Sequence, residues 1–363
     1  MIYFLFFILL LVLSFFDLFS KKEKTKNLLF IISASLLFLF CTLRYGLGFD
    51  YFNYQVIFDS VPTEFSLTAT FEGIHGERLF LFIFLLFKAI GIDYAYANSI
   101  IIAIIAIFFI RFINKYSSYK TFSVLVLYAW FFVYVFALLR QGLAMSLFCG
   151  LAYPMLTKKA YVKYYLTILV CIFIHSASFV CLFVPFVIKY FPRLRKYYLL
   201  IVLFLFGLLP FSGILLSIIG RLTGATYYLT EGELSIGALL NRIIVFLIIF
   251  YLCKTKDKTL SSMKDLYFLG FFIYLLTAQS DLIASRLGAY FKIFEIILLP
   301  ICFNKFSYKS SPIAFFIIYV YLGYMLMSII GTMSDQYGYA NAWDYPYVTI
   351  FNQDDLVIFE HNY

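Results

Sequence analysis

The chain has 363 residues, of which 64% are hydrophobic and only 13% are charged, and its formal net charge is +9. Soluble domains carry about 25% charged residues, so a soluble fold is excluded because it could not cover this much apolar surface. Repeated apolar runs instead indicate membrane-crossing helices, since a membrane β-barrel requires short segments of alternating hydrophobicity. We therefore expect an all-α, polytopic transmembrane helix bundle that forms a single integral membrane domain over residues 1–363.

Basic segments divide the chain into crossings, because short cytoplasmic loops of membrane proteins collect Lys and Arg. The first apolar run, 2–19, is followed by the basic segment 21–26. Placing every basic segment in the cytoplasm gives about 12 crossings, with both termini outside. The other basic segments are 111–120, 158–163, 189–196, 254–264 and 305–309.

Three apolar runs do not fit a single crossing each. Run 79–90 is short against the roughly 20 residues of a span, so we expect it to re-enter or to lie in the interface, whereas Lys88 near its end argues for a crossing. Run 121–156 would be about 54 Å long as one helix, so it must turn, and Arg140-Gln141-Gly142 is its polar break. Run 164–188 is expected to turn at His175. The remaining outer segments are the loops at about 44–78 and 220–241 and the C-terminal tail at about 332–363.

Every basic residue that this topology leaves on the outer face, outside the apolar runs, is an arginine. A guanidinium holds phosphate through a planar two-pronged fork, whereas lysine offers only a point charge. The pattern therefore favours phosphate recognition by several of these residues. The alternative is that some, in particular Arg78, Arg221 and Arg242, are helix-end side chains that reach the interface. The outer arginines are Arg44, Arg78, Arg140, Arg221, Arg242 and Arg286.

The segment 44–54 opens the first polar stretch on this face. Asp50 lies beside aromatic residues above a helix end, where it could act as a general base towards a sugar hydroxyl. An ion pair with Arg44 that only shapes the loop explains Asp50 equally well. Gly46 and Gly48 indicate a tight turn rather than a dinucleotide site, because no βαβ pattern surrounds them. Tyrosines that could stack on sugar rings or line the interface are Tyr45, Tyr51 and Tyr54.

Glu77 and His175 are further candidates for chemistry. Glu77 is a second acid, or else a helix N-terminal residue that the helix dipole favours. His175 is the only histidine in an apolar run. It is either a satisfied polar group or, as is usual for ionisable residues inside membranes, a functional residue that binds phosphate or transfers a proton. No HExxH motif, Walker motif or metal-ligand cysteine spacing is present, so we expect no metal, no cofactor and no nucleic-acid partner.

An ordered set of motifs over nearly the whole chain resembles the EpsG family, a branch of the Wzy-like exopolysaccharide and O-antigen polymerases. One departure is Ser176, where the family pattern leads us to expect a proline after His175. The resembling residues are Arg44-Tyr45-Gly46-Leu47-Gly48-Phe49-Asp50-Tyr51 with Tyr54, then Glu77, Leu139-Arg140-Gln141-Gly142-Leu143-Ala144, His175-Ser176-Ala177-Ser178, Arg286 with Tyr290, and Asp344-Tyr345-Pro346-Tyr347.

The resemblance implies a metal-independent glycosyltransferase of the bacterial inner membrane with a GT-C-like site on its outer face. Such polymerases join oligosaccharide repeat units carried on undecaprenyl pyrophosphate, among membrane lipids and with a chain-length regulator as an expected partner. It implies that Arg44, Arg140 and Arg286 hold the pyrophosphate. Asp50 or His175, with Glu77 as a further acid, would take the acceptor proton. Sugar or lipid contacts would be made by Tyr51, Tyr54, Gln141 and Tyr290.

Three alternatives remain open at this point. A GT-C-type transferase that uses a lipid monophosphate sugar predicts addition of single sugars. An O-antigen-type ligase shares arginine and histidine on the same face. A flippase or transporter for lipid-linked sugars predicts an internal repeat and charges along a path through the core, and the sequence shows neither.

Overall fold

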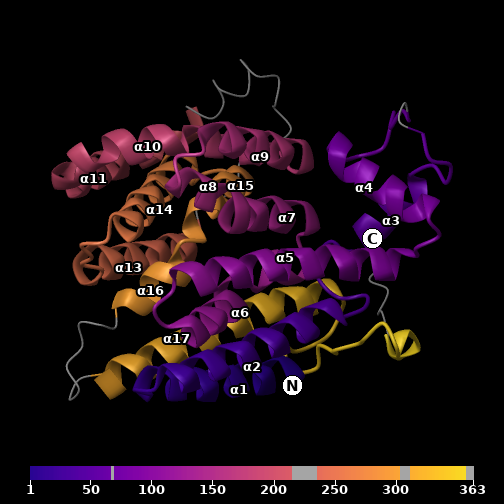
Figure 1. Cartoon of the computed structure of the whole chain (residues 1–363), viewed down its shortest axis with the longest axis horizontal. Helices are drawn as coiled ribbons and strands as arrows, with labels where there is room; N and C mark the ends of the chain where they lie inside the picture. Colours follow the sequence, from indigo (N-terminus) through magenta and orange to yellow (C-terminus); the bar gives the residue numbers. More distant parts are fainter. Residues whose placement is uncertain (67–68, 215–234, 303–310, 357–363) are drawn as a thin grey trace. The chain divides into compact units, whose positions relative to one another are not determined.

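The computed structural model describes residues 1–66, 69–214, 235–302 and 311–356 (Figure 1). Within these ranges the chain is helical, and its only strand-like pairing is an isolated antiparallel bridge between Arg44 and Thr349. The all-α prediction is therefore confirmed. The chain forms two compact units, Met1–Ser176 with Phe306–Tyr363 and Ala177–Lys305. Arg221 and most of the expected outer loop at 220–241 lie outside the described residues.

The first unit is built around α6 (Lys120–Phe136), which is buried along nearly its whole length. Helices α1 (Ile2–Phe19), α2 (Glu23–Thr42), α5 (Tyr94–Tyr116) and α17 (Ser311–Gln336) surround it, and Figure 1 shows α1, α2 and α17 lying alongside it. The long apolar run that the sequence shows from 121 therefore begins with a central helix that is packed on all sides.

After α6 the chain turns at Ala137 and Leu138 into α7 (Leu139–Leu147), next to the polar break expected at Arg140. A π-helical turn η1 (Phe148–Ala152) leads into α8 (Tyr153–Thr157), and α9 (Tyr161–Ile174) then packs on α7. The run 121–156 thus turns, and its second half is a continuous helical stretch from Leu139 to Thr157 that contains one π-helical turn.

Two short helices, α3 (Tyr51–Ser60) and α4 (Arg78–Ala89), contact each other and α5 in the same unit. The Lys88 ammonium donates to the carbonyl oxygens of Phe58, Asp59 and Val61, at 3.2, 2.7 and 2.6 Å, and so caps the end of α3. The 12 residues of α4 extend only about 18 Å, which is too short to cross a core of about 30 Å. The charge of Lys88 therefore satisfies a helix end and gives no support for a crossing.

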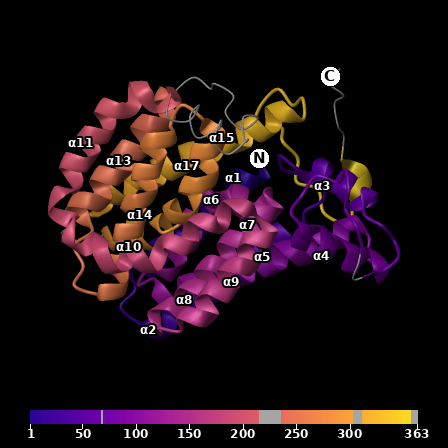
Figure 2. The same ribbon diagram turned by 90° about the horizontal axis from the view of Figure 1, so that it is seen from above.

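In the second unit, α14 (Lys258–Thr277) contacts most of the other helices, and Figure 2 shows several of them side by side. Its partners are α10 (Val184–Tyr190), α11 (Tyr198–Leu208), α13 (Ile236–Leu252), α15 (Asp281–Lys292) and α16 (Glu295–Cys302). The 3₁₀ turns of this region are η2 (Ser176–Phe183), η3 (Phe191–Arg193), η4 (Arg195–Tyr197) and η5 (Leu209–Phe211).

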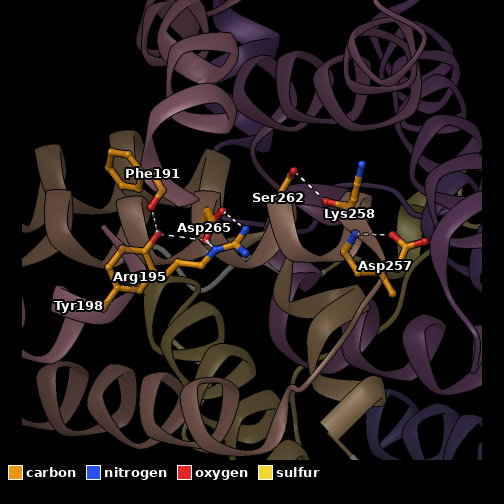
Figure 3. A network of polar contacts seen from close by, with 8 residues as sticks. Phe191, Arg195, Tyr198, Asp257, Lys258, Ser262 and Asp265 are labelled. Carbon is orange, nitrogen blue, oxygen red and sulfur yellow. Dashed lines mark hydrogen bonds and ion pairs between the residues drawn. The ribbon is translucent and has the colours of Figure 1, made fainter. Parts of the chain in front are cut away.

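A buried carboxylate joins α14 to the segment before α11 (Figure 3). Asp265 is 1% exposed and accepts from Arg195 Nε at 2.8 Å, from Arg195 Nη2 at 2.5 Å and from the Tyr198 hydroxyl at 3.0 Å. A buried carboxylate requires such partners, because an uncompensated charge in an apolar interior is strongly destabilising.

We expect Arg195→Ala to lower the free energy of unfolding by about 2–3 kcal/mol, since Asp265 would keep only the tyrosine hydroxyl. The measurement is a thermal melt of the purified protein in detergent. Arg193→Ala is the matched control, because it removes the same charge from an exposed neighbouring position. Equal melting temperatures for the two variants would contradict this role of Asp265.

Six described helical segments are long and apolar enough to cross a membrane, which confirms a helical membrane protein. The expected count of about 12 crossings was wrong by this criterion. Three further apolar runs form helices shorter than a span, namely Lys120–Phe136, Tyr161–Ile174 and Ile236–Leu252. The six segments are Ile2–Phe19, Glu23–Thr42, Tyr94–Tyr116, Ser176–Arg193, Arg195–Ile214 and Phe316–Gln336.

Candidate functional site

The loop that begins at Arg44 is held in place by the C-terminal tail. The Tyr45 N–H donates to the Val348 carbonyl at 2.8 Å, and the Ile350 N–H donates to the Leu43 carbonyl at 2.9 Å. Further along, the Tyr337 hydroxyl donates to the Gly48 carbonyl at 2.6 Å. The tail therefore lies along the loop and satisfies its backbone groups.

Gly48 brings this loop against the turn between α6 and α7. Its φ of +108° is a backbone conformation that side chains disfavour, and an added Cβ would lie 3.0 Å from the Cβ of Ala137. The Gly48 N–H also donates to the Tyr345 hydroxyl at 3.0 Å. The glycine thus lets the loop that begins at Arg44 pack directly beside the segment that carries Arg140.

Arg44 is enclosed beneath this loop, with only 1% of its surface exposed. Its guanidinium carbon lies 4.4 Å from the ring centroid of Phe136 and 5.5 Å from that of Tyr51, and its Nη1 donates to the Leu47 carbonyl. Its Nε and Nη2 have no hydrogen-bond partner within the described ranges. Aromatic faces stabilise this charge and fix the ring of Tyr51, so Arg44 shapes the loop from within.

Asp50 is half-buried at the residue before α3. Its role, as a base or as a partner of Arg44, stays a prediction. Burial raises the pKa of the nearby Tyr337 phenol, Arg44 offsets part of this shift and Asp50 adds to it. The Asp50 carboxylate therefore acts on the tail tyrosine electrostatically.

Arg140, at the start of α7, is held on two sides. Its Nη1 donates to Glu77 Oε2 at 2.7 Å, and its Nε donates to the Tyr54 hydroxyl at 3.4 Å. The other oxygen of Glu77 accepts the backbone N–H of Ser176 at 2.9 Å. We call Tyr54, Glu77, Arg140 and the Ser176 N–H the Arg140 cluster. These groups come from four segments that are far apart in the sequence.

One nitrogen of this arginine remains available. The Arg140 side chain is 17% exposed, and Nη2 has no hydrogen-bond partner among the residues that the structure describes. A guanidinium whose orientation is fixed by a carboxylate and a phenol presents its remaining N–H groups in one direction. Such an arrangement suits a phosphate oxygen, which accepts charge-assisted hydrogen bonds.

His175 adjoins the Arg140 cluster. Helix α9 ends at Ile174, His175 adopts an extended backbone and is 7% exposed, and the 3₁₀ turn η2 starts at Ser176. A helix therefore ends at the position where the sequence predicts a turn. The position places a buried imidazole directly before the backbone N–H that Glu77 binds.

Electrostatics keep Glu77 ionised. Burial raises the pKa of its carboxyl, but the Ser176 hydrogen bond and the Arg140 charge, with a smaller contribution from His175, outweigh burial and hold the pKa below its ordinary value of 4.5. A carboxylate with a lowered pKa is a weak base near neutral pH, so its contacts favour a positioning role.

A pH titration tests this assignment. Stability from a carboxylate with a lowered pKa is present above the ordinary pKa and is lost as the pH falls through the lowered value. We expect the difference in melting temperature between the parent protein and Glu77→Gln to stay constant from about pH 8 to about pH 5 and to shrink below about pH 4.5. A difference that already declines between about pH 7 and pH 5 would contradict it.

Two other predicted site residues lie on α15 in the second unit. Tyr290 is fully buried, and its hydroxyl is 2.7 Å from the Ser178 hydroxyl, so it links α15 to the turn after His175. Arg286 is half-buried on the same helix.

Arg242 was either a phosphate-binding residue or a helix-end side chain in the sequence prediction. Its guanidinium carbon lies 3.8 Å from the Tyr274 ring centroid. Gln141, next to Arg140, is buried in the first unit.

The tail residues Tyr337 and Tyr345 were not among the predicted site residues, although both bond the first motif. The sequence offered one signal for them, the Asp344-Tyr345-Pro346-Tyr347 motif, which was noted only as part of the resemblance. A dense group of tyrosines with one proline after the last apolar run could have indicated an ordered tail.

The protein is a helical membrane protein, because several of its helices can cross a membrane. Its partly buried arginine–carboxylate cluster, built from distant segments, is a polar site suited to an anion. Residues 27–345, most of the chain, match the family model of EpsG, and the protein belongs to the EpsG family. EpsG is a family of Wzy-like polymerases, so membership implies an exopolysaccharide polymerase-like function and confirms the predicted resemblance. No curated protein and no solved structure matches the chain.

Proposed function

We propose that the protein is a bacterial polysaccharide polymerase that joins undecaprenyl-pyrophosphate-linked repeat units at the outer leaflet of the inner membrane. The observation that carries the proposal is the Arg140 cluster, in which a fixed guanidinium keeps one nitrogen free. The family supplies the class of reaction, and the cluster supplies a group suited to a pyrophosphate.

In the proposed reaction a hydroxyl oxygen of the acceptor unit attacks the anomeric carbon of the growing chain. The bond from that carbon to the pyrophosphate oxygen breaks, and its electron pair leaves with the pyrophosphate. Arg140 stabilises the charge that develops on the leaving oxygens, an effect that is largest where the hydrogen-bond donor is fixed before the reaction. The pyrophosphate-linked sugar chain is already activated, so the step requires no ATP.

The acceptor proton must pass to a base. His175 and Asp50 both adjoin the Arg140 cluster in the sequence. His175 directly precedes Ser176, and the backbone carbonyl oxygen of Asp50 accepts the Tyr54 N–H at 2.9 Å. An imidazole has an ordinary pKa near 6.5 and exchanges protons readily at neutral pH. Glu77 is assigned to hold Arg140, and the predicted role of Arg286 in pyrophosphate binding stays a prediction.

The test is polymer synthesis in a strain whose own copy of the gene is deleted. Complementation with the parent gene restores long polymer, whereas Asp50→Asn and His175→Ala show which residue is the base by loss of polymer at normal protein level. If such a variant still makes and exports single repeat units, its defect lies in polymerisation and not in transport. Normal polymer length in both variants would contradict both base assignments.

A further inference from the structure

A basic cavity lies in the second unit, beside the end of α13 and the start of α14. Its volume is about 370 Å³, within the range of about 300–1,000 Å³ of small-molecule sites. None of its lining residues belongs to the Arg140 cluster, so a ligand in it would be separate from the proposed polymerisation site. The charged residues that line it are Arg195, Lys254, Lys256, Lys264 and Asp265.

Two of the cations are held in fixed positions. Asp265 binds Arg195 through Nε and Nη2 (Figure 3), yet the arginine side chain is 42% exposed and its guanidinium has further N–H groups. The half-buried Lys264 ammonium donates to the Phe250 and Cys253 carbonyl oxygens at 3.1 and 2.9 Å, which leaves one of its three protons. Both cations therefore keep donors for a ligand.

Three further side chains at the cavity are accessible and unengaged. Lys254 and Lys256 are exposed, and their ammonium groups make no ion pair or hydrogen bond within the described ranges. The half-buried Ser261 has a hydroxyl that likewise makes no hydrogen bond to a described residue. Donors from the loop and from the first turn of α14 thus reach the same cavity.

The charge of the cavity selects an anion. Its single carboxylate, Asp265, is already bound by Arg195. The next acid in the sequence, Asp257, does not line the cavity, and its carboxylate accepts the Leu260 N–H at 2.9 Å as the cap of α14. The lysines therefore leave an excess of positive charge. A phosphate group suits it, because several oxygens can accept charge-assisted hydrogen bonds from arginine, lysine and serine at once.

An apolar stripe on α13 ends at this cavity. Ile244, Leu247 and Tyr251 are 51%, 40% and 56% exposed, and their spacing of three and four residues places them on one face of the helix. Tyr251 follows Phe250, which lines the cavity. The basic segments 189–196 and 254–264 are predicted to be cytoplasmic, and basic residues at that surface attract anionic lipids. Acyl chains along the stripe would place a lipid headgroup at the cavity.

We propose that this cavity binds a phosphate group through Arg195, Lys264, Ser261 and the two loop lysines. The apolar stripe favours an anionic membrane lipid as the source of the phosphate, and a soluble phosphate compound is the other source that the same donors would accept. The proposal does not rest on the polymerase function.

The experiment measures lipid binding to the purified full-length protein in neutral detergent, by native mass spectrometry and by thermal melts. The probes are phosphatidylglycerol and, as the zwitterionic reference, phosphatidylcholine. We expect phosphatidylglycerol to bind more tightly and to raise the melting temperature, because a ligand of the folded state stabilises it. The double variant Lys254→Gln with Lys256→Gln is expected to weaken this binding about fivefold for each lysine.

Two variants separate a built site from general charge attraction. Lys21→Gln with Lys22→Gln removes the same charge from exposed positions outside the cavity, and it is expected to leave the affinity unchanged. Ser261→Ala keeps the charge and is expected to weaken binding about fivefold, the loss of one hydrogen bond. Melting temperatures without lipid near that of the parent show that all variants are folded.

Soluble probes identify the source of the phosphate. If inorganic phosphate or glycerol 3-phosphate alone raises the melting temperature, and Lys254→Gln with Lys256→Gln abolishes the effect, the source is a soluble phosphate compound. If only phosphatidylglycerol does so, the source is a lipid. The proposal is overturned by no preference for phosphatidylglycerol together with no effect of the soluble phosphates, or by the same loss of affinity in the Lys21 and Lys22 control. Binding that is unchanged in both the lysine pair and Ser261→Ala would also overturn it.

Discussion

Cells that carry Arg140→Ala in place of the parent gene are expected to lose long polymer, with a fall in the polymerisation rate of about 10²–10³-fold. That factor is typical for removal of one fixed donor to a developing negative charge. Arg140, in the motif Leu139–Ala144, bonds both Tyr54 and Glu77. Alanine at this position therefore removes the proposed anion contact and also the hydrogen bonds that hold the cluster together. Polymer length is read from a gel of the extracted polysaccharide, and the rate from incorporation of labelled sugar.

Two variants sharpen this prediction. Arg140→Lys keeps the charge but cannot bond Glu77, Tyr54 and an anion with a planar fork, so we expect it to restore little activity. Arg78→Ala is the matched control, since Arg78 is an exposed arginine directly after Glu77 and makes no ion pair among the described residues. Long polymer with Arg140→Ala, or its loss with Arg78→Ala to the same degree, would contradict the role of Arg140.

Gly142→Ala is expected to have the second large effect, on folding. An added Cβ at Gly142 would lie 2.0 Å from the backbone oxygen of Tyr134, far inside any normal contact. The obstacle is backbone at the end of α6, so α7 would have to move away from the central helix and carry Arg140 with it. Overpacking of this kind destabilises proteins by about 1–3 kcal/mol or more. We expect a lower melting temperature, a smaller yield of folded protein and loss of polymer.

Gly207→Ala is the control for this change. Gly207 lies within α11, and an added Cβ there has nothing within 4 Å. Alanine is favoured over glycine inside helices by about 1 kcal/mol, so this variant should keep or raise the melting temperature. If Gly142→Ala melts at the same temperature as Gly207→Ala, the close approach of α7 to α6 does not limit stability.

The composition alone identified a helical membrane protein, because so apolar a chain has no other way to satisfy its backbone. The polar residues within the apolar runs also located the helix ends at His175 and near Arg140. The number of spans was not predictable in this way. Basic segments mark each apolar run as a crossing, whereas the helices Lys120–Phe136 and Tyr161–Ile174 are shorter than a span.

The candidate site, too, was predictable from the sequence only in part. The sequence grouped Arg44, Asp50 and Arg140 because all three are polar residues in an apolar chain. It could not show that Arg44 is buried against Phe136, a ring more than ninety residues further on. It also could not show that the positive φ of Gly48 lets the tail tyrosines close over the loop. Those contacts depend on tertiary packing, which leaves no local pattern in the sequence.

The most direct measurement of the central claim is polymerisation by the purified protein in lipid vesicles. The substrate is a repeat unit linked to undecaprenyl pyrophosphate, supplied without ATP. The account predicts a ladder of products that differ by one repeat unit, with undecaprenyl pyrophosphate released at each step, and no ladder with Arg140→Ala. Products extended by single sugars from a lipid monophosphate donor, movement of the lipid-linked unit without a new glycosidic bond, or no product from the folded parent protein would contradict it.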